Sequence, residues 1–343
     1  MSESSPSNVP PKAIVRQSVA GPHLDGFAQA MHNILSTKIA EETFAQLLDG
    51  LPLADVAQDS ANAELPYSHP LFDVHEELCP GVLEKTRQYR HQLDATSLQL
   101  DAALIADYRA ASPGSRAFNT RLVEMAAVAV HEMAVQLFNN GPMFHSDDGI
   151  ASWVPPKDDD LTVWWEFFPD GAWPTLFRHG WYVDHDQYPN GVADMAGYWA
   201  EARIFGGVVL FDRRSPITCP DAEPDSVWIH PDRAGGTYRL VQLLDGQKQA
   251  LLALLTLPCP NLALLPILVD KRNTVREDPE EPIDEIGIYR DKWDRKPLAP
   301  DAVDSRRARR CVWDQTDYPT RADFDRACWR GRESESELYR SMQ

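Results

Sequence analysis

The spacing of the apolar residues changes near residue 150, and this change restricts the folds open to the chain. Before it, apolar residues recur every three to four positions over long stretches, which is typical of helices. After it, short runs rich in Val, Ile, Trp, Tyr and Phe are separated by Gly and Pro, which is typical of strands and turns. We therefore expect an α+β fold, in which a helical N-terminal half packs on a mainly antiparallel β-rich half with C-terminal helices.

Three apolar-periodic stretches predict the helices of the first half. The first runs from Leu24 to Leu48, and Asn33 and Ser36 mark a break between two shorter helices. The second covers about Val82 to Ala111. The third, Phe118 to Phe138, is apolar nearly all round, so we expect it to be a central buried helix.

Short β-favouring runs and two further helices are predicted in the second half. A helix is expected from Asp245 to Leu257, and another from about Arg306. We divide the chain into a disordered tail (1–20), a helical region (21–150) and a β-rich region with C-terminal helices (151–343). The last two regions could form one integrated domain. The predicted strands are Thr162–Phe168, Thr175–Val183, Arg203–Phe211, Ser226–His230 and Thr237–Leu243.

The composition restricts the partners of the protein. The 343 residues include 52 Asp and Glu against 33 Lys and Arg, which gives a formal charge of -19. Nucleic-acid binding depends on cations that meet phosphates, so we expect no nucleic-acid partner and no anionic membrane surface. The most apolar stretch, 118–138, contains Arg121 and Glu124, so no membrane span is expected either.

The two ends of the chain and the cysteines bear on its location. The first residues carry no apolar run of a secretory signal, and five scattered cysteines form no C-x-x-C. We therefore expect a reducing compartment, with neither a disulfide framework nor a structural zinc site at the cysteines. Cytoplasm is the expected location. The basic run at 306–310 leaves the nucleus as an alternative, although a solvated helix face is the competing interpretation.

Residues 174–239 concentrate side chains that can do chemistry, so we take them as the candidate site. Histidine and carboxylate side chains are ligands of zinc and iron, and they are also acids and bases near neutral pH. Seven of the ten tryptophans lie between Trp153 and Trp228, which indicates an aromatic pocket or interface. The candidate catalytic residues are His185, His230, Asp184, Asp186 and Glu201, and the candidate substrate-binding residues are Arg239, Trp181, Tyr188 and Trp199.

His185 and His230 are also the candidate ligands of a divalent metal, iron or zinc. With Arg239 they have roughly the spacing of iron oxygenases that use 2-oxoglutarate. In that pattern an acid lies two positions after the first histidine, whereas this chain has Gln187 there. A metal site, an acid–base site without metal and a purely structural role for the segment therefore remain alternatives. His131 begins a zinc-protease-like pattern that lacks its second histidine, so we expect it to be a core or interface residue.

Three stretches of the chain resemble a group of hypothetical proteins of filamentous fungi. They are YSHPLFDVH at 67–75, FNTRLVEMAAVAVHEMAVQLF at 118–138, and DHDQYPNGVADMAGYWAEARIFGGVVLFDR within 179–213. The resemblance implies a fungal, intracellular protein and an association with secondary metabolism. It implies no particular reaction and no catalytic residues.

Two functions follow from these observations as hypotheses. The first is an enzyme that acts on a small, partly apolar metabolite through a His/carboxylate site, with or without a metal. The alternative is a non-catalytic protein whose aromatic pocket binds a ligand or a partner chain. Both hypotheses expect a small-molecule ligand or a partner at the tryptophan-rich region, and neither specifies the oligomeric state.

Overall fold

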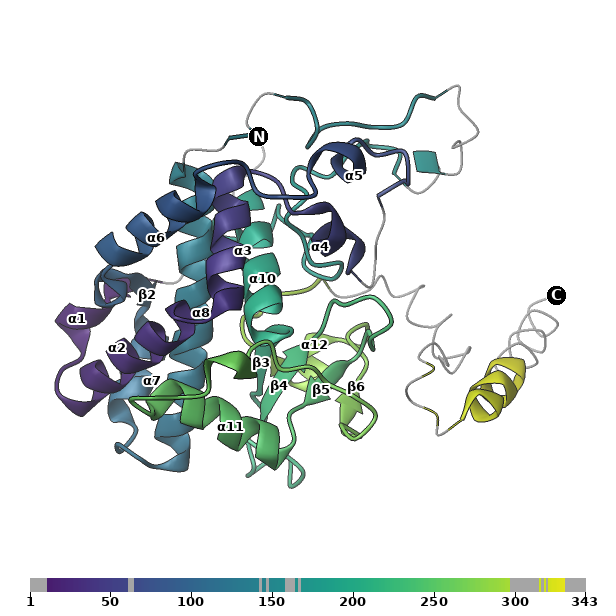
Figure 1. Ribbon diagram of the computed structural model, residues 1–343. Helices are drawn as coiled ribbons and strands as arrows, with labels where there is room; N and C mark the ends of the chain where they lie inside the picture. Colours follow the sequence, from purple (N-terminus) through teal and green to yellow (C-terminus); the bar gives the residue numbers. More distant parts are fainter. Residues whose placement is uncertain are drawn as a thin grey trace, which may run out of the picture.

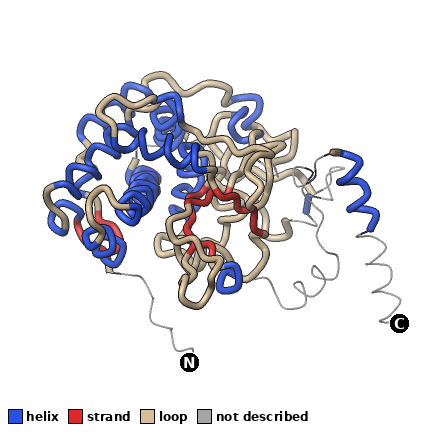
Figure 2. Tube along the Cα trace, turned by 90° about the horizontal axis from the view of Figure 1, so that it is seen from below, coloured by secondary structure: helices blue, strands red, loops and turns tan. Residues whose placement is uncertain are grey.

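The α+β class is confirmed: a helical half lies beside a small, curled antiparallel sheet (Figures 1 and 2). The computed structural model describes residues 11–60, 65–141, 144–145, 148–157, 164–165, 168–296, 315, 318 and 320–330. The longer helices gather on one side of the molecule, with a separate two-stranded pair among them, and the strands of the larger sheet curl together on the other side.

The helical half is built around α8, which is buried along most of its length. The Ser115 side chain caps it by accepting a hydrogen bond from the amide of Phe118. The expected central helix at 118–138 is therefore confirmed. The elements of this half are β1 (Lys12–Ile14), α1 (Val15–Ser18), α2 (Pro22–Leu35), α3 (Lys38–Asp49), α4 (Ala54–Gln58), α5 (Leu71–Val74), α6 (Val82–Gln92), η1 (Ala95–Ser97), β2 (Gln99–Asp101), α7 (Ala102–Ala110) and α8 (Arg116–Asn140).

The predicted break in the first helical stretch is also confirmed. Thr37 caps α3 through its side-chain oxygen, which accepts from the amide of Ala40, so α2 and α3 are separate helices. By contrast, the single helix predicted over Val82–Ala111 was wrong. That stretch divides into α6 and α7, because Asp101 caps a new helix with its carboxylate. Part of the predicted tail is also ordered, since β1 pairs with β2 in antiparallel register.

The sheet has the strand order β6-β5-β4-β3-β7, and every pairing is antiparallel. The strands predicted at Ser226–His230 and Thr237–Leu243 are confirmed as β4 and β5. The elements of this half are α10 (Val192–Phe205), β3 (Val208–Asp212), β4 (Val227–His230), β5 (Leu240–Gln242), α11 (Asp245–Thr256), η2 (Leu262–Leu264), β6 (Arg276–Glu277), α12 (Ile283–Ile286) and β7 (Ile288–Tyr289).

Two strand predictions in this half were wrong in whole or in part. Residues 175–183 form an irregular segment with one turn at 180–181, where the amide of Tyr182 donates to the carbonyl of His179. Residues 203–205 belong to the end of α10, and the strand begins only at Val208. Gly206, with a φ of 99°, ends α10, and a Cβ there would lie 2.1 Å from the carbonyl oxygen of Ile267.

One further predicted helix is present, and two other predicted elements lie mostly or partly outside the described residues. The helix predicted at Asp245–Leu257 is confirmed as α11. The strand predicted at Thr162–Phe168 lies mostly outside the described residues, and so does the start of the helix predicted from Arg306. Residues 321–330 are helical.

Both faces of the sheet are buried, and the two faces differ in what covers them. Val209 and Phe211 of β3 point into the main apolar core with α8 and α10. Val208 and Leu210 alternate to the other face, where Tyr182 and its aromatic neighbours cover them. The aromatic segment around Tyr182, which was predicted to form a site, therefore covers one face of the sheet.

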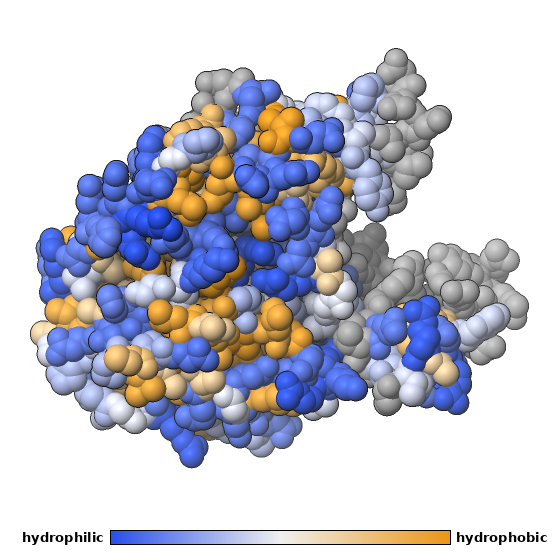
Figure 3. Space-filling model, in the orientation of Figure 1, coloured by the Kyte–Doolittle hydropathy of each residue, from blue (hydrophilic) through white to orange (hydrophobic). Residues whose placement is uncertain are grey.

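The surface combines many charged side chains with apolar side chains around α11 and the segment that follows it (Figure 3). Leu257, Leu262 and Leu268 are exposed in that region. None of the helices in the described part of the chain has the length and apolar character needed to span a bilayer.

Candidate metal centre

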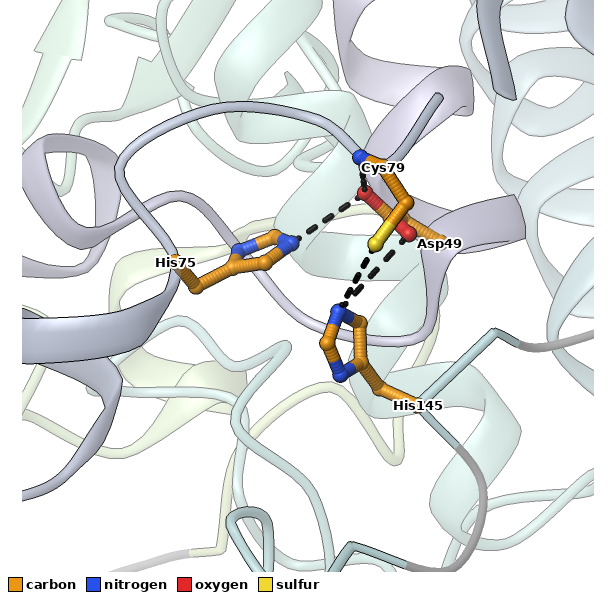
Figure 4. Close-up of side chains that lie close together, drawn as sticks. All are labelled: Asp49, His75, Cys79 and His145. Atoms are coloured by element: carbon orange, nitrogen blue, oxygen red, sulfur yellow. Dashed lines mark hydrogen bonds and ion pairs between the residues drawn. The ribbon is translucent and has the colours of Figure 1, made fainter. Parts of the chain in front are cut away.

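Three segments far apart in the sequence meet at the C-terminal end of α3 (Figures 1 and 4). Asp49 is the last residue of α3, and Gly50 ends the helix with a left-handed φ of 101°. The backbone carbonyl of Asp49 accepts hydrogen bonds from the amides of Phe144 and His145, both at 3.0 Å. These bonds bring the segment after α8 to α3. The loop between α5 and α6 supplies His75 and Cys79.

Four side chains converge at this point: Asp49, His75, Cys79 and His145, which we call the Asp49 cluster (Figure 4). Their ligand atoms all lie within 4.8 Å of one another. His75 Nε2 is 3.1 Å from Asp49 Oδ2, and His145 Nε2 is 3.2 Å from Cys79 Sγ and 3.9 Å from Asp49 Oδ1. The amide of Cys79 donates to Asp49 Oδ2 at 2.9 Å. The cluster could hold a metal ion.

Groups outside the cluster fix the orientation of both imidazoles. His75 Nδ1 is 3.0 Å from the carbonyl oxygen of Pro52, and His145 Nδ1 is 2.5 Å from Asp148 Oδ2. A carbonyl or carboxylate oxygen accepts hydrogen bonds, so each Nδ1 carries a proton and donates it. Each Nε2 therefore faces the cluster either with a lone pair or with a second proton. This arrangement is the one that orients histidine ligands in metal sites.

The electrostatics of the cluster favour a cation. Asp49 is fully buried, lies at the negative end of the α3 dipole, and has one carboxylate oxygen, Oδ1, that makes no hydrogen bond. Burial opposes ionisation of this carboxyl, but hydrogen bonds from His75 and Cys79 outweigh burial and lower its pKa. For His75, burial is likewise outweighed by the hydrogen bond to Asp49, and the pKa is raised. Asp49 thus supplies a buried negative charge, for which His75 is the nearest balancing group.

The same cluster contains a second, catalytic-looking arrangement. Cys79, His145 and Asp148 follow one another at hydrogen-bond distance, as nucleophile, base and orienting acid do in cysteine enzymes. Burial, followed by the Asp49 carboxylate, raises the pKa of the Cys79 thiol, whereas a nucleophilic cysteine needs a lowered pKa. The position of Asp49 therefore favours a metal over a free thiolate nucleophile.

The two predicted metal ligands, His185 and His230, do not contact each other in the described part of the structure. His230 is fully buried, with Nε2 2.9 Å from the carbonyl oxygen of Tyr238 and Nδ1 3.3 Å from the Tyr182 hydroxyl. Its neighbouring imidazole is His179, at 4.9 Å between ring centroids. Within the described residues, no ring contact or hydrogen bond joins His230 to His185. The expected pairing rested on the spacing of an iron-oxygenase pattern, which does not by itself fix how the two residues are placed in the fold.

The carboxylates predicted beside His185 lie at the surface. Asp184 and Asp186 both pair with Lys296, at 3.1 and 2.8 Å. The Lys296 ammonium lowers the pKa of Asp186 through a hydrogen bond. The two acids therefore make ion pairs at the surface, exposed for Asp186 and partly buried for Asp184, and among the described residues no imidazole donates a hydrogen bond to either.

Glu201, by contrast, lies in a buried ionic cluster with His131, Asp194 and Arg290, which we call the Glu201 cluster. Glu201 Oε2 accepts from Arg290 Nη1 at 2.6 Å and lies 3.6 Å from His131 Nδ1. His131 Nε2 is 2.9 Å from Asp194 Oδ1. Burial alone would lower the pKa of His131, but the hydrogen bond to Asp194 and the nearby Glu201 carboxylate raise it to about 9.

The predicted substrate-binding residues have structural contacts. The Trp199 ring packs on Phe177 in the main core, at 4.7 Å between centroids. Trp181 stacks on Tyr238, and the Tyr188 hydroxyl donates to the carbonyl oxygen of Asp294. The guanidinium of Arg239 lies 5.5 Å from the centre of the Tyr238 ring.

The charge of His131 makes a pH effect testable. A histidine whose pKa rises from 6.5 to about 9 on folding stabilises the fold fully below pH 6.5, and this contribution is lost as the pH rises through 9. We therefore expect the free energy of unfolding to fall between pH 6.5 and 9. The loss should be smaller in His131→Gln, measured by urea unfolding at several pH values. If the free energy of unfolding changes equally with pH in the wild-type protein and in His131→Gln, His131 is neutral in the folded state.

The Asp49 cluster was absent from the sequence analysis, which expected no metal site at a cysteine. The only local signal is the pattern His75-x-x-x-Cys79. The other two ligands lie 26 residues before His75 and 66 residues after Cys79. No spacing rule connects such positions, because the ends of α3 and α8 bring them together.

The comparisons with known proteins identify no relative. The chain matches no protein-family model, no curated protein and no solved structure. Function is therefore argued from the sites alone.

Proposed function

We propose that the protein is a zinc protein, in which the Asp49 cluster binds one ion. The observation that carries the proposal is the hydrogen bonding of the two Nδ1 atoms, which leaves His75 Nε2 beside the Asp49 carboxylate and His145 Nε2 beside Cys79 Sγ, with all four ligand atoms within 4.8 Å of one another. One sulfur, two imidazole nitrogens and one carboxylate oxygen suit tetrahedral zinc. Iron is less suited to this donor set, because non-haem iron sites combine two histidines with a carboxylate and open positions.

The ion would have a structural role in this proposal. Four protein ligands fill a tetrahedral zinc and leave no position for water or substrate, which is the pattern of structural sites. The ligands come from the end of α3, the loop before α6 and the segment after α8. Zinc would therefore tie three segments together and fix the loop that carries α4 and α5. An enzymatic activity on a metabolite stays a separate hypothesis, for which the charged cavity described below is the better location.

Zinc binding can be measured directly on the full-length protein. After removal of metals by a chelator and addition of zinc, we expect one ion per chain by elemental analysis after dialysis. Cys79→Ser and His145→Ala should lose it. The matched controls are Cys259→Ser and His91→Ala, since both residues are exposed and lie outside the cluster.

Two results would contradict the proposal. One is a wild-type protein that retains no zinc while it is folded. The other is rapid alkylation of Cys79 by iodoacetamide in saturating zinc, which would favour the Cys79–His145–Asp148 arrangement of a nucleophile. Zinc bound through Cys79 should instead slow alkylation of Cys79 and leave alkylation of Cys259 unchanged.

A further inference from the structure

A second site is the cavity of about 250 Å³ between β1, α7, α8, the start of α10 and the residues after β7. At about 30 Å³ per water molecule, it has room for roughly eight waters, or for a small metabolite. Its walls are mostly charged, and it shares no residue with the Asp49 cluster. The arrangement of these charges indicates the ligand.

One wall has an excess of positive charge. Glu124, which is buried, accepts hydrogen bonds from both Arg121 and Arg213. Two guanidinium groups share one carboxylate, so one positive charge is left over. Arg121 has five N–H donors, and among the described residues it uses only Nη1. A carboxylate in the cavity can therefore find free donors here.

The neighbouring wall, which adjoins Arg213 at the carbonyl oxygen of Arg290, has an excess of negative charge. The two cations of the Glu201 cluster, His131 and Arg290, face the carboxylates of Asp194 and Glu201 and, in addition, that of Asp291. Asp291 is the outermost of the three, with its side chain 30% exposed and 3.1 Å from Arg290 Nε. Burial, with the nearby Asp294 and Glu124, outweighs Arg290 and raises the pKa of Asp291 to about 6. A cation beside Asp291 would stabilise its charged form.

The remaining charges of the lining are partly balanced within the protein. Lys12 pairs with Glu132, and the Asp101 carboxylate accepts from two amides at the start of α7. Asp107, which is exposed, adds one more negative charge. A purely anionic ligand would therefore meet an excess of carboxylates, and a purely cationic one would meet the guanidinium groups of Arg121 and Arg213 without offering them an acceptor.

We propose that this cavity binds a small zwitterion of the free amino-acid type, with its carboxylate on Arg121 and Arg213 and its ammonium group on Asp291. Such a molecule places an anion at the positive wall and a cation at the negative wall, so both walls are neutralised by one ligand. The cavity volume limits the ligand to a few carbon atoms beyond these two groups.

The proposal is tested by comparing small probes that carry both charges with small probes that carry only one. L-alanine, β-alanine and γ-aminobutyrate carry both charges, whereas propionate and propylamine carry one each. We expect at least one zwitterion to bind the full-length protein about tenfold or more tightly than both single-charge probes, by titration calorimetry. The same binding is expected in His75→Ala, because the metal centre shares no residue with the cavity. This last measurement separates the present proposal from the zinc proposal.

Variants then locate the ligand. Arg121→Gln and Asp291→Asn should each weaken binding of the best zwitterion about tenfold or more, whereas Arg109→Gln, an exposed arginine of α7 outside the lining, should not. Propylamine or propionate binding as tightly as every zwitterion would overturn the proposal. So would failure of all three zwitterions to bind, or binding of the zwitterion that Asp291→Asn and Arg121→Gln leave unchanged.

Discussion

Glu201→Ala is expected to lower the free energy of unfolding by about 3–5 kcal/mol, because it removes one partner from a buried ionic cluster. Glu201 is fully buried and uses both carboxylate oxygens. Oε2 pairs with Arg290, and Oε1 accepts from the amide of Val209 at 2.6 Å. Its removal would leave a buried guanidinium and a buried amide without these partners. Denaturation in urea, followed by tryptophan fluorescence, measures the change.

The matched comparison uses the surface carboxylates. Asp184→Asn and Asp186→Asn remove one acid each from the exposed pairs with Lys296, so no change beyond experimental error is expected. Glu201→Gln should lie between these and Glu201→Ala, since it keeps an acceptor for Val209 and loses the charge. If Glu201→Ala is no less stable than Asp184→Asn, the Glu201 cluster does not contribute to stability.

The sequence predicted well those elements whose signals are local. The helix at 118–138 has an apolar period and a Ser115 cap, and the strand at 226–230 is a short β-favouring run. By contrast, α10 was not predicted. All of its residues except Val192 and Arg203 are buried, so it has no polar face from which a helical period could be recognised.

The candidate site was predicted less well, for a related reason. Glu201 was predicted to be a catalytic carboxylate; in the structure it is buried in an ionic cluster, and its partners His131 and Arg290 lie 70 residues before it and 89 after it. His131 was assigned to the core or an interface, and it is indeed buried, but its place in an ionic cluster that borders the cavity was not predicted. His185 and His230 were linked by the spacing of an iron-oxygenase pattern, and no hydrogen bond or ring contact joins them among the described residues. Spacing along a chain predicts contacts only within one regular element, and these contacts join several.

The other large effect concerns zinc. A ligand that binds only the folded state stabilises it according to its concentration relative to its Kd, by about 4.1 kcal/mol at a thousandfold excess. Free zinc at that excess should raise the free energy of unfolding of the wild-type protein by this amount. In His75→Ala this stabilisation by zinc should be lost, because one of the four ligands is absent. His91→Ala, an exposed histidine of α6, should respond to zinc as the wild-type protein does.

Asp148 provides a sharper test, because it would act on zinc only through His145. Its carboxylate holds His145 Nδ1 at 2.5 Å and lies outside the set of proposed ligands. Loss of such a partner weakens metal binding about 10- to 100-fold, so Asp148→Asn should lose about 1.4–2.7 kcal/mol of the zinc stabilisation. In the chelated protein its stability should change less than this. If the cluster were instead a catalytic cysteine centre that binds no zinc, added zinc would change the free energy of unfolding of wild type, His75→Ala and Asp148→Asn by the same amount.

Because the ion would join α3, the loop before α6 and the segment after α8, its removal should also make the α4–α5 loop more open to proteolysis.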